Sequence, residues 1–449
     1  MPASTRREFL KHTGRIAAST ALAGVALPHV HAAEDNTIRL ALIGCGGRGC
    51  GAAADAFESA NGPVKLTVMA DLFEDRLASG HHALSEKYQS QMDVPPDRRF
   101  VGFDAWRKAI DSLRPGDVAM LCGYSAWRPQ QLEYAVEKGV NVFMEKSFAP
   151  DVPGLRRIIK AGEAAEKKNL KIASGLMCRH AISRQELVQR IHDGELGDVL
   201  LIRGYRMQKV GVLPKRPVQE NDLNWQIRHF TDFLWVSGGW FAEMNIHQID
   251  EFCWLKDAYP ISAHGVGGRA ADSTDCGQTL DSIAVEWTFA DGTKATHVVR
   301  WLANCFDDCT TFVHGTKCAA QFPGSAHPGP LFIHKDQRVA RDNICWRAKP
   351  DQYTAWQNEW NVLLDAIRNN KPHNEAKRAA LSNVTDLMGR AAVHSGKIIT
   401  WDEAMASNFQ FSQVLTNSMP IPHRRCKLTS RGVTLLPSLA NGPRFEKLL

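Results

Sequence analysis

A glycine-rich turn between a buried strand and a helix of small residues constrains the fold of this chain most. Residues 37–43 (TIRLALI) have the apolar pattern of a buried parallel strand, and GCGGRG at 44–49 follows at once. Residues 52–59 are rich in alanine and predict a helix that packs closely on a sheet. Glycines spaced GxGxxG allow a tight bend and close backbone approach to a phosphate, and the helix N-terminus supplies N–H donors. We therefore predict a dinucleotide-binding turn formed by Gly44, Gly46, Gly47, Arg48 and Gly49.

An acidic residue ends the next predicted strand and indicates which dinucleotide binds. Residues 64–70 form a second apolar run that leads to Asp71. A carboxylate at this place accepts hydrogen bonds from the ribose hydroxyls of adenosine and repels a 2′-phosphate. The sequence therefore predicts NAD in preference to NADP. GxGxxG on its own would also fit a glycine-rich surface loop.

Strand and helix patterns continue to alternate beyond this point, which is typical of an α/β fold. Further strands are predicted at 117–122, 141–144 and 170–174, and helices at 132–138 and 155–168. The pattern predicts a doubly wound parallel sheet of the Rossmann type. We place this NAD-binding domain at residues 34–175.

A second domain of different construction is predicted after residue 175. Segments with the period-two alternation of strands in an open sheet lie at 199–203, 283–289, 294–301 and 310–314. Residues 209–228 contain prolines and asparagines, and predict a long loop that covers the substrate. Helices are predicted at 240–255, 352–369 and 379–395. We predict a substrate domain at 176–350, a helical segment at 351–408, and an extended tail at 409–449 that bridges subunits of a homo-oligomer.

The first 33 residues have the layout of a twin-arginine export signal. Arg6 and Arg7 precede an apolar stretch at 16–27, and small residues follow at 30–33. The apolar stretch is too short and too weakly hydrophobic to span a bilayer permanently. We therefore expect an exported, periplasmic protein, tethered to the membrane only if the signal is not cleaved.

Charge and cysteine content narrow the classes of partner. The formal net charge of +6 is small for 449 residues, and no basic run with interleaved aromatic residues occurs, so we expect no nucleic-acid partner. The eleven cysteines are odd in number and lack the paired CxxC spacing of a structural zinc site. We interpret most of them as buried thiols and expect no metal.

Two further motifs resemble the Gfo/Idh/MocA oxidoreductases, a family named for glucose-fructose oxidoreductase and inositol dehydrogenase. Glu145-Lys146-Ser147 ends a predicted strand where the family has Glu-Lys-Pro. Residues 237–250 (SGGWFAEMNIHQID) resemble the family's second motif, which has glycines, an acidic residue and a histidine. Shorter matches extend the resemblance over residues 37–405, at Arg179-His180, 194–197, 267–269, Glu359-Trp360, Gly396-Lys397 and Trp401-Asp402.

The resemblance implies an N-terminal Rossmann fold, a C-terminal domain with an open, mostly antiparallel sheet, and later helices that pack back on the Rossmann domain. It places Lys146 on the family's catalytic lysine and His247 on its catalytic histidine. Glu243 stands where aspartate is common in the family. Ser147 in place of proline and Arg128 in place of a common histidine are departures that would reshape the nicotinamide pocket.

The predicted helix at 240–255 places three polar residues on one face. Glu243, His247 and Asp250 follow at spacings of four and three residues. An imidazole between two carboxylates would be oriented by them, and its pKa would be raised. The same face would also suit a divalent cation, although the resemblance implies chemistry without metal.

Hydride transfer from an alcohol requires a base for the hydroxyl proton, and two residues have the right chemistry. We predict His247 as this base and Lys146 as an ammonium that polarises the substrate oxygen. The alternatives are a surface lysine in a salt bridge and a hydrogen-bonded core histidine. Glu145 and Lys146 are also predicted to contact the cofactor. Predicted sugar contacts are Arg179, Asp250 and Trp240, the tryptophan by stacking.

These features predict an NAD(H)-dependent oxidoreductase that acts on a hydroxyl or keto group of a sugar or cyclic polyol. One alternative is an NAD-retaining glycoside hydrolase or lyase that oxidises its sugar transiently. Export favours that alternative, because free NAD is scarce outside the cytoplasm. The other alternative is a non-catalytic sugar-binding protein on the same fold.

Overall fold

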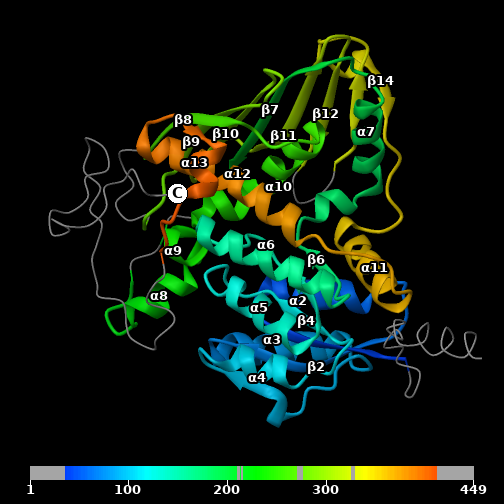
Figure 1. The fold of residues 1–449 in the computed structure, drawn as a ribbon, viewed down its shortest axis with the longest axis vertical. Helices are drawn as coiled ribbons and strands as arrows, with labels where there is room; N and C mark the ends of the chain where they lie inside the picture. The colour runs from blue at the N-terminus through cyan, green and yellow to red at the C-terminus, as the bar shows by residue number, and fades with distance from the viewer. Residues whose placement is uncertain (1–35, 210–212, 214–215, 270–276, 325–328, 412–449) are drawn as a thin grey trace, which may run out of the picture.

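The computed structural model describes residues 36–209, 213, 216–269, 277–324 and 329–411. The predicted export signal at 1–33 and the part of the predicted tail after residue 411 lie outside these residues. In Figure 1 the two sheets lie at opposite ends of the molecule, and long helices lie between them.

Six parallel strands form the first sheet, in the order β3-β2-β1-β4-β5-β6. They are β1 (Ile38–Ile43), β2 (Val64–Asp71), β3 (Arg99–Val101), β4 (Val118–Leu121), β5 (Asn141–Met144) and β6 (Ile172–Ser174). β1 pairs with β2 on one side and with β4 on the other, so the strand order reverses between β1 and β4. Open α/β sheets bind ligands at the carboxyl ends of the strands at such a switch point. The predicted doubly wound parallel sheet is confirmed.

The helices of this half begin earlier than the sequence pattern indicates. They are α2 (Gly47–Phe57), α3 (Glu74–Lys87), α4 (Ala105–Asp111), α5 (Arg128–Lys138) and α6 (Val152–Lys167). α2 begins inside the glycine turn, which forms its first turn, and not near residue 52 as predicted. α5 and α6 each carry a proline in the first turn, where the missing N–H leaves no helical hydrogen bond unmade.

Nine strands form the second sheet, in the order β14-β13-β12-β11-β7-β10-β9-β8-β15. They are β7 (Val199–Gln208), β8 (Ser262–Gly268), β9 (Ser282–Thr288), β10 (Lys294–Trp301), β11 (Asp308–Gly315), β12 (Ala319–Pro323), β13 (Phe332–His334), β14 (Ile344–Arg347) and β15 (Ile399–Thr400). β7 pairs with β10 in parallel, and the other described pairs in this sheet are antiparallel. The open, mostly antiparallel sheet is thus confirmed. β8 and β12 to β15 escaped prediction because they are glycine-rich or very short.

The remaining helices connect or separate the two sheets. They are α7 (Ile182–His192), α8 (Asp222–Arg228), α9 (Leu234–Ser237), α10 (Gly239–Lys256), α11 (Ala355–Arg368), α12 (Ala376–Ser395) and α13 (Trp401–Ala406), with short 3-10 helices at Pro96–Arg98, Met177–His180, Phe230–Asp232 and Arg341–Asn343. The predicted loop at 209–228 is wrong in its last part, which is α8. Asn221 caps this helix by accepting from the N–H groups of Leu223 and Asn224. Asparagine favours both loops and helix N-caps, so the composition of the segment was misleading.

Buried helices join the two halves of the molecule. α12 contacts α6, α10, β8 and β9, and lies between the sheets in Figure 1. Gly389 allows α12 to approach the second sheet, because a Cβ atom there would lie 2.5 Å from the indole of Trp287. α11 packs back on α2, and its Trp360 stacks on Phe143 of β5 with ring centroids 4.7 Å apart. The position of α10 relative to the first sheet is therefore fixed by core packing.

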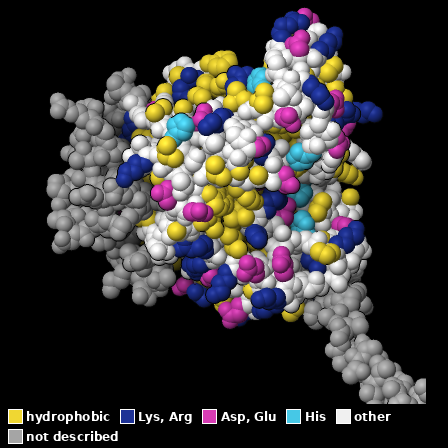
Figure 2. Space-filling view, turned by 45° about the horizontal axis from the view of Figure 1, so that its top comes forward, with side chains coloured by type: hydrophobic (Ala, Val, Ile, Leu, Met, Phe, Trp, Pro, Cys, Tyr) yellow, Lys and Arg dark blue, Asp and Glu magenta, His cyan; other side chains and the backbone are white. Residues whose placement is uncertain are grey.

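The surface and the cysteines add few constraints on function. Within the described residues, each helix is too short or too polar to cross a membrane. Acidic and basic side chains are interspersed on the face shown in Figure 2, around a group of hydrophobic side chains near its centre. All nine cysteines of the described chain are free thiols, and four of them are buried.

Candidate functional site

The glycine turn between β1 and α2 requires glycine at its first and last positions. Gly44 has a φ of 98°, and a Cβ atom on it would lie 2.5 Å from the backbone nitrogen of Gly123. A Cβ atom on Gly49 would lie 1.9 Å from the carbonyl oxygen of Gly44. These contacts account for the tight bend and for the close packing of α2 on the turn.

The middle of the same turn is open and suits an anion. A Cβ atom on Gly46 or Gly47 would meet nothing within 4 Å, so the backbone here borders free space. α2 begins at Gly47, and no side chain caps its N-terminus. The first N–H groups of a helix favour a phosphate both as donors and through the helix dipole. The turn therefore fits the pyrophosphate of a dinucleotide.

A cleft of about 630 Å³ runs from the turn to the ends of β4 and β5. The predicted cofactor-contacting residues line it together, namely Gly44, Gly46, Gly47, Arg48, Gly49, Asp71, Glu145 and Lys146. Glu243 of α10 lines it as well, so the second domain contributes to the same cleft. Residues 100 or more positions apart in sequence meet here because the strands of a parallel sheet end at one edge.

Asp71 is fixed by backbone donors at the end of β2. Its carboxylate accepts from the N–H of Cys45 at 2.7 Å and from the N–H of Phe73 at 2.8 Å. Each carboxylate oxygen has a further lone pair, and the residue lines the cleft, so it can still accept from a ribose hydroxyl. Burial raises the pKa of Asp71 despite these two donors.

Arg48 is engaged by protein carboxylates. Its Nε donates to Glu145 at 2.5 Å, and its Nη1 lies 3.4 Å from a carboxylate oxygen of Asp55. The side chain therefore holds Glu145 at the end of β5, while its Nη2 has no hydrogen-bond partner.

Lys146 is held by the second domain. Its ammonium donates to the Glu243 carboxylate at 2.9 Å and to the Glu243 carbonyl oxygen at 2.7 Å. The single proton of the Ser147 hydroxyl is shared between the Ser237 carbonyl oxygen, at 2.9 Å, and the other Glu243 carboxylate oxygen, at 3.1 Å. Serine at this position thus adds a hydroxyl that contacts both the acidic residue that pairs with the lysine and the turn before α10.

His247 departs from its predicted environment. It is buried, its Nδ1 has no hydrogen-bond partner, and it does not lie between two carboxylates. Burial, together with the Lys146 ammonium, lowers the pKa of His247 well below its ordinary value. The predicted rise in pKa is therefore wrong. The reason is that Glu243 pairs with Lys146, and Asp250 pairs with Arg179.

The predicted sugar contacts do not gather around Lys146. Arg179 forms a two-point ion pair with Asp250, at 2.8 and 2.9 Å, and Arg179 lines a different cleft. Asp250 also accepts from Ser382 at 2.6 Å and is 1% exposed. Trp240 is likewise 1% exposed and stacks on Trp301, so it is a core residue that no sugar can reach. The structure thus places Arg179 and Asp250 in an ion pair and Trp240 in the core, and does not gather them into a sugar site beside Lys146.

Several cleft residues were missed from the sequence. Arg76, Tyr124 and Phe230 line the cleft, and the Arg76 guanidinium donates to the Tyr124 hydroxyl. α8 reaches across to α3 through the ion pair of Arg228 with Asp75, at 2.8 Å. The only sequence signal for this contact is the concentration of aromatic residues around 225–235. Their spacing has no period that would have indicated a site.

Arg128, a departure from the family pattern, lies under the cleft. It is 1% exposed, and its guanidinium donates to the carbonyl oxygens of Ser147 and Gly123. Gly123 follows the end of β4 and Ser147 follows the end of β5. Arg128 therefore ties the end of β4 to the end of β5.

Asp386 of α12 leads to a prediction about pH and stability. It is fully buried, and neither carboxylate oxygen has a hydrogen-bond partner. Burial raises the pKa of Asp386 from 3.8 to about 8; the Arg390 guanidinium opposes this rise and the Glu243 charge adds to it. Between pH 4 and 8 the unfolded carboxyl is ionised while the folded one is neutral, so unfolding releases a proton and stability falls as pH rises. We expect Asp386→Asn to be about 2–4 kcal/mol more stable than the parent at pH 8.5.

The measurement for Asp386→Asn is urea unfolding at pH 5 and at pH 8.5. The difference between variant and parent should shrink at the lower pH, because the free energy needed to protonate the carboxyl on folding decreases as the pH approaches the unfolded pKa of 3.8. Asp193→Asn, at an exposed position of the chain, is the matched control and should change little at either pH. An unchanged pH dependence in Asp386→Asn would show that Asp386 is ionised in the folded protein.

Comparison with known proteins supports the family resemblance for the second domain. Residues 184–321 match the GFO/IDH/MocA C-terminal domain. No curated protein matches the sequence.

Solved structures extend the similarity to both halves. The aldose-aldose oxidoreductase of Caulobacter crescentus, solved with glycerol, has a TM-score of 0.63 at 17% identity, covering 81% of this chain and 99% of its own. The scyllo-inositol dehydrogenase of Lactobacillus casei, solved with NAD(H) and scyllo-inositol, has a TM-score of 0.61 at 20% identity, covering 81% and 99%. The myo-inositol 2-dehydrogenase of Lactobacillus plantarum has a TM-score of 0.61 at 19% identity, covering 81% and 99%. The chain therefore shares the two-sheet fold of these oxidoreductases, and residues 184–321 match the C-terminal domain of the GFO/IDH/MocA family.

Proposed function

We propose that this protein is an NAD(H)-dependent oxidoreductase that acts on a hydroxyl or keto group of a sugar or cyclic polyol. The observation that carries the proposal is the cleft that joins the glycine turn and Asp71 to the Lys146 ammonium. The turn and Asp71 suit a dinucleotide, and Lys146 supplies a proton donor at the other end. The similarity to oxidoreductases whose names include inositol and aldose supports a polyhydroxylated substrate.

Lys146 is the residue that we assign to the substrate oxygen. An ammonium has three donors, and Glu243 receives two of them, which leaves one for a hydroxyl or carbonyl oxygen. In the reductive direction Lys146 Nζ gives a proton to the developing alkoxide, and in the oxidative direction neutral Nζ accepts the hydroxyl proton. When bound, NAD(H) supplies the hydride acceptor or donor.

His247 receives a different role from the one predicted. Its lowered pKa keeps the imidazole neutral around pH 7, and formation of an imidazolium is disfavoured by burial and by Lys146. We propose that neutral His247 helps to position the substrate by hydrogen bonding, and that Lys146 carries the proton transfer. Glu243 fixes the Lys146 ammonium through its carboxylate and its carbonyl oxygen.

The proposal is tested by cofactor content and by turnover. Denaturation of the purified protein should release NAD or NADH in preference to the 2′-phosphorylated forms, as detected by mass spectrometry. The reason is that the Asp71 carboxylate would repel a 2′-phosphate. Absorbance at 340 nm should change on addition of a matching sugar or inositol. Binding of NADP(H) alone would contradict the cofactor assignment, and sugar binding without any redox change would favour the non-catalytic alternative.

One observation favours the NAD-retaining alternative, in which a glycoside is oxidised, cleaved and reduced again. Arg76 and Tyr124, which are hydrogen-bonded to each other, line the same cleft as Asp71, and Arg76 also donates to the carbonyl oxygen of Arg228 in α8. A segment in this place would slow cofactor release. Export, which we propose from the N-terminal pattern, would make retention useful. Glycoside turnover without added NAD, by protein that keeps its cofactor through gel filtration, would select this alternative.

A further inference from the structure

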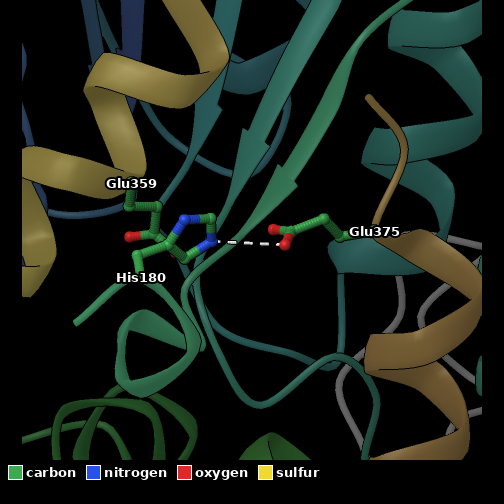
Figure 3. Close-up of side chains that lie close together, drawn as sticks. All are labelled: His180, Glu359 and Glu375. Carbon is green, nitrogen blue, oxygen red and sulfur yellow. Dashed lines mark hydrogen bonds and ion pairs between the residues drawn. The ribbon is translucent and has the colours of Figure 1, made fainter. Parts of the chain in front are cut away.

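A second group of chemically active side chains lies away from the cleft. His180, Glu359 and Glu375 come from the 3-10 helix after β6, from α11 and from the residue that precedes α12. Their potential ligand atoms lie within 4.8 Å of one another, and His180 Nε2 is 3.2 Å from Glu375 Oε1. Figure 3 shows the imidazole between the two carboxyl groups. The arrangement that was predicted for α10 is therefore found at a different histidine.

Glu359 has no partner that accounts for its burial. It is 0% exposed, and neither of its carboxylate oxygens accepts a hydrogen bond. Its carboxyl group points toward His180 in Figure 3. A buried carboxylate without a donor or a counter-ion is costly by several kcal/mol, so the group must be either protonated or bound to a cation.

The ion pairs around the group leave Glu359 uncompensated. Arg378 pairs with Glu375, and Asp250 pairs with Arg179 and Arg378. Among the described residues, no side chain forms an ion pair or a hydrogen bond with the Glu359 carboxyl group. A bound cation would supply the positive charge that this carboxylate lacks.

The group also has an opening to the surface. His180 and Glu375 line a second cleft, of about 450 Å³, together with Arg179, His192 and Arg378. This cleft gives an ion a path from solvent and leaves room for a water ligand. Arg378 donates to the same Glu375 oxygen that faces His180, so a bound ion would share this carboxylate with a guanidinium.

We propose that His180, Glu359 and Glu375 bind one divalent transition-metal ion, with its open coordination position toward the second cleft. One imidazole and two carboxylates form a ligand set suited to Mn²⁺, Fe²⁺ or Zn²⁺. The ion would join three segments that are far apart in sequence, and so stabilise the packing of α11 and α12 on the first sheet. This site departs from our expectation from sequence that no metal is bound, and it does not depend on the proposed function.

Mn²⁺ is the probe of choice, because the free thiols of this chain would compete for Zn²⁺. After treatment with a chelator, the full chain should bind one Mn²⁺ in isothermal titration, and its Tm should rise with Mn²⁺ concentration. His180→Ala and Glu359→Gln should weaken binding by more than about tenfold. Both variants should still fold, which far-UV circular dichroism checks.

His192→Ala is the matched control, because this histidine lines the same cleft and is not one of the three ligands. It should bind Mn²⁺ as the parent does. The proposal is overturned if the parent shows no saturable binding, or if His180→Ala binds as tightly as the parent. Equal stability of Glu359→Gln and the parent, without any Mn²⁺ effect, would instead identify Glu359 as a neutral, protonated acid.

Discussion

Turnover of the sugar or polyol falls by about a thousandfold or more when Lys146 is replaced by methionine, if Lys146 moves the proton. Methionine keeps much of the length and volume of the side chain but has neither the charge nor the donors. Cofactor content should persist, because the glycine turn and Asp71 lie at the other end of the cleft. The measurements are kcat from absorbance at 340 nm and cofactor content by mass spectrometry.

Lys138→Met is the matched control for this experiment. Lys138 also forms an ion pair, at 2.6 Å from Asp111, but both side chains are more than 40% exposed. Its replacement should leave kcat within a factor of about two, since exposed ion pairs contribute little. If Lys146→Met turns over like the parent, then Lys146 serves only as a structural partner of Glu243.

The pH profile separates the two candidate proton carriers. Because the pKa of His247 is lowered well below 6.5, its titration should produce no step in kcat between pH 6 and 8. A step near pH 6.5 that disappears in His247→Asn would restore His247 as the base.

The second large effect concerns stability. Glu251→Ala is expected to lower the free energy of unfolding by about 3–5 kcal/mol, because it leaves the Arg184 guanidinium buried without its carboxylate partner. The two side chains are each 2% exposed and form an ion pair between α7 and α10. α10 carries Glu243 and His247, so loss of this pair should also reduce turnover through the position of that helix.

A double replacement distinguishes the cost of an unpaired charge from the loss of packing. Arg184→Met combined with Glu251→Leu removes both charges and should recover most of the stability lost in Glu251→Ala. Urea unfolding of the parent, the single variants and the double variant gives the coupling between the two positions. If the destabilisation of the double variant equals the sum of those of Arg184→Met and Glu251→Leu, the two positions are not coupled, and the expected cost of the unpaired guanidinium is contradicted.

Much of the fold could be predicted because local patterns decide it. The strands of the first sheet are continuous apolar runs, and those of the second sheet that were predicted alternate with period two, so each type was recognised without tertiary information. Helix starts were less accurate. At α2, α5 and α6, glycine or proline occupies the first turn, and those residues also occur in loops.

The candidate site was predicted only where one motif lies on one strand end. Gly44, Asp71 and Lys146 each follow a predicted strand, and parallel topology alone brings them to one cleft. The face of α10 was recognised, but its partners were not. Spacing along a helix places Glu243, His247 and Asp250 on one side, yet it does not show that Lys146 and Arg179 bind the two carboxylates.

By itself, the sequence determined the order of the elements, the glycine turn and the acidic strand end, because these depend on residues close together along the chain. Tertiary structure alone decided which charges meet. It paired Lys146 with Glu243, left His247 neutral and buried, placed Trp240 in the core, and assembled His180, Glu359 and Glu375 from three distant segments. The physical reason is that burial and charge pairing depend on side chains from distant segments, whose approach is set by packing of whole helices.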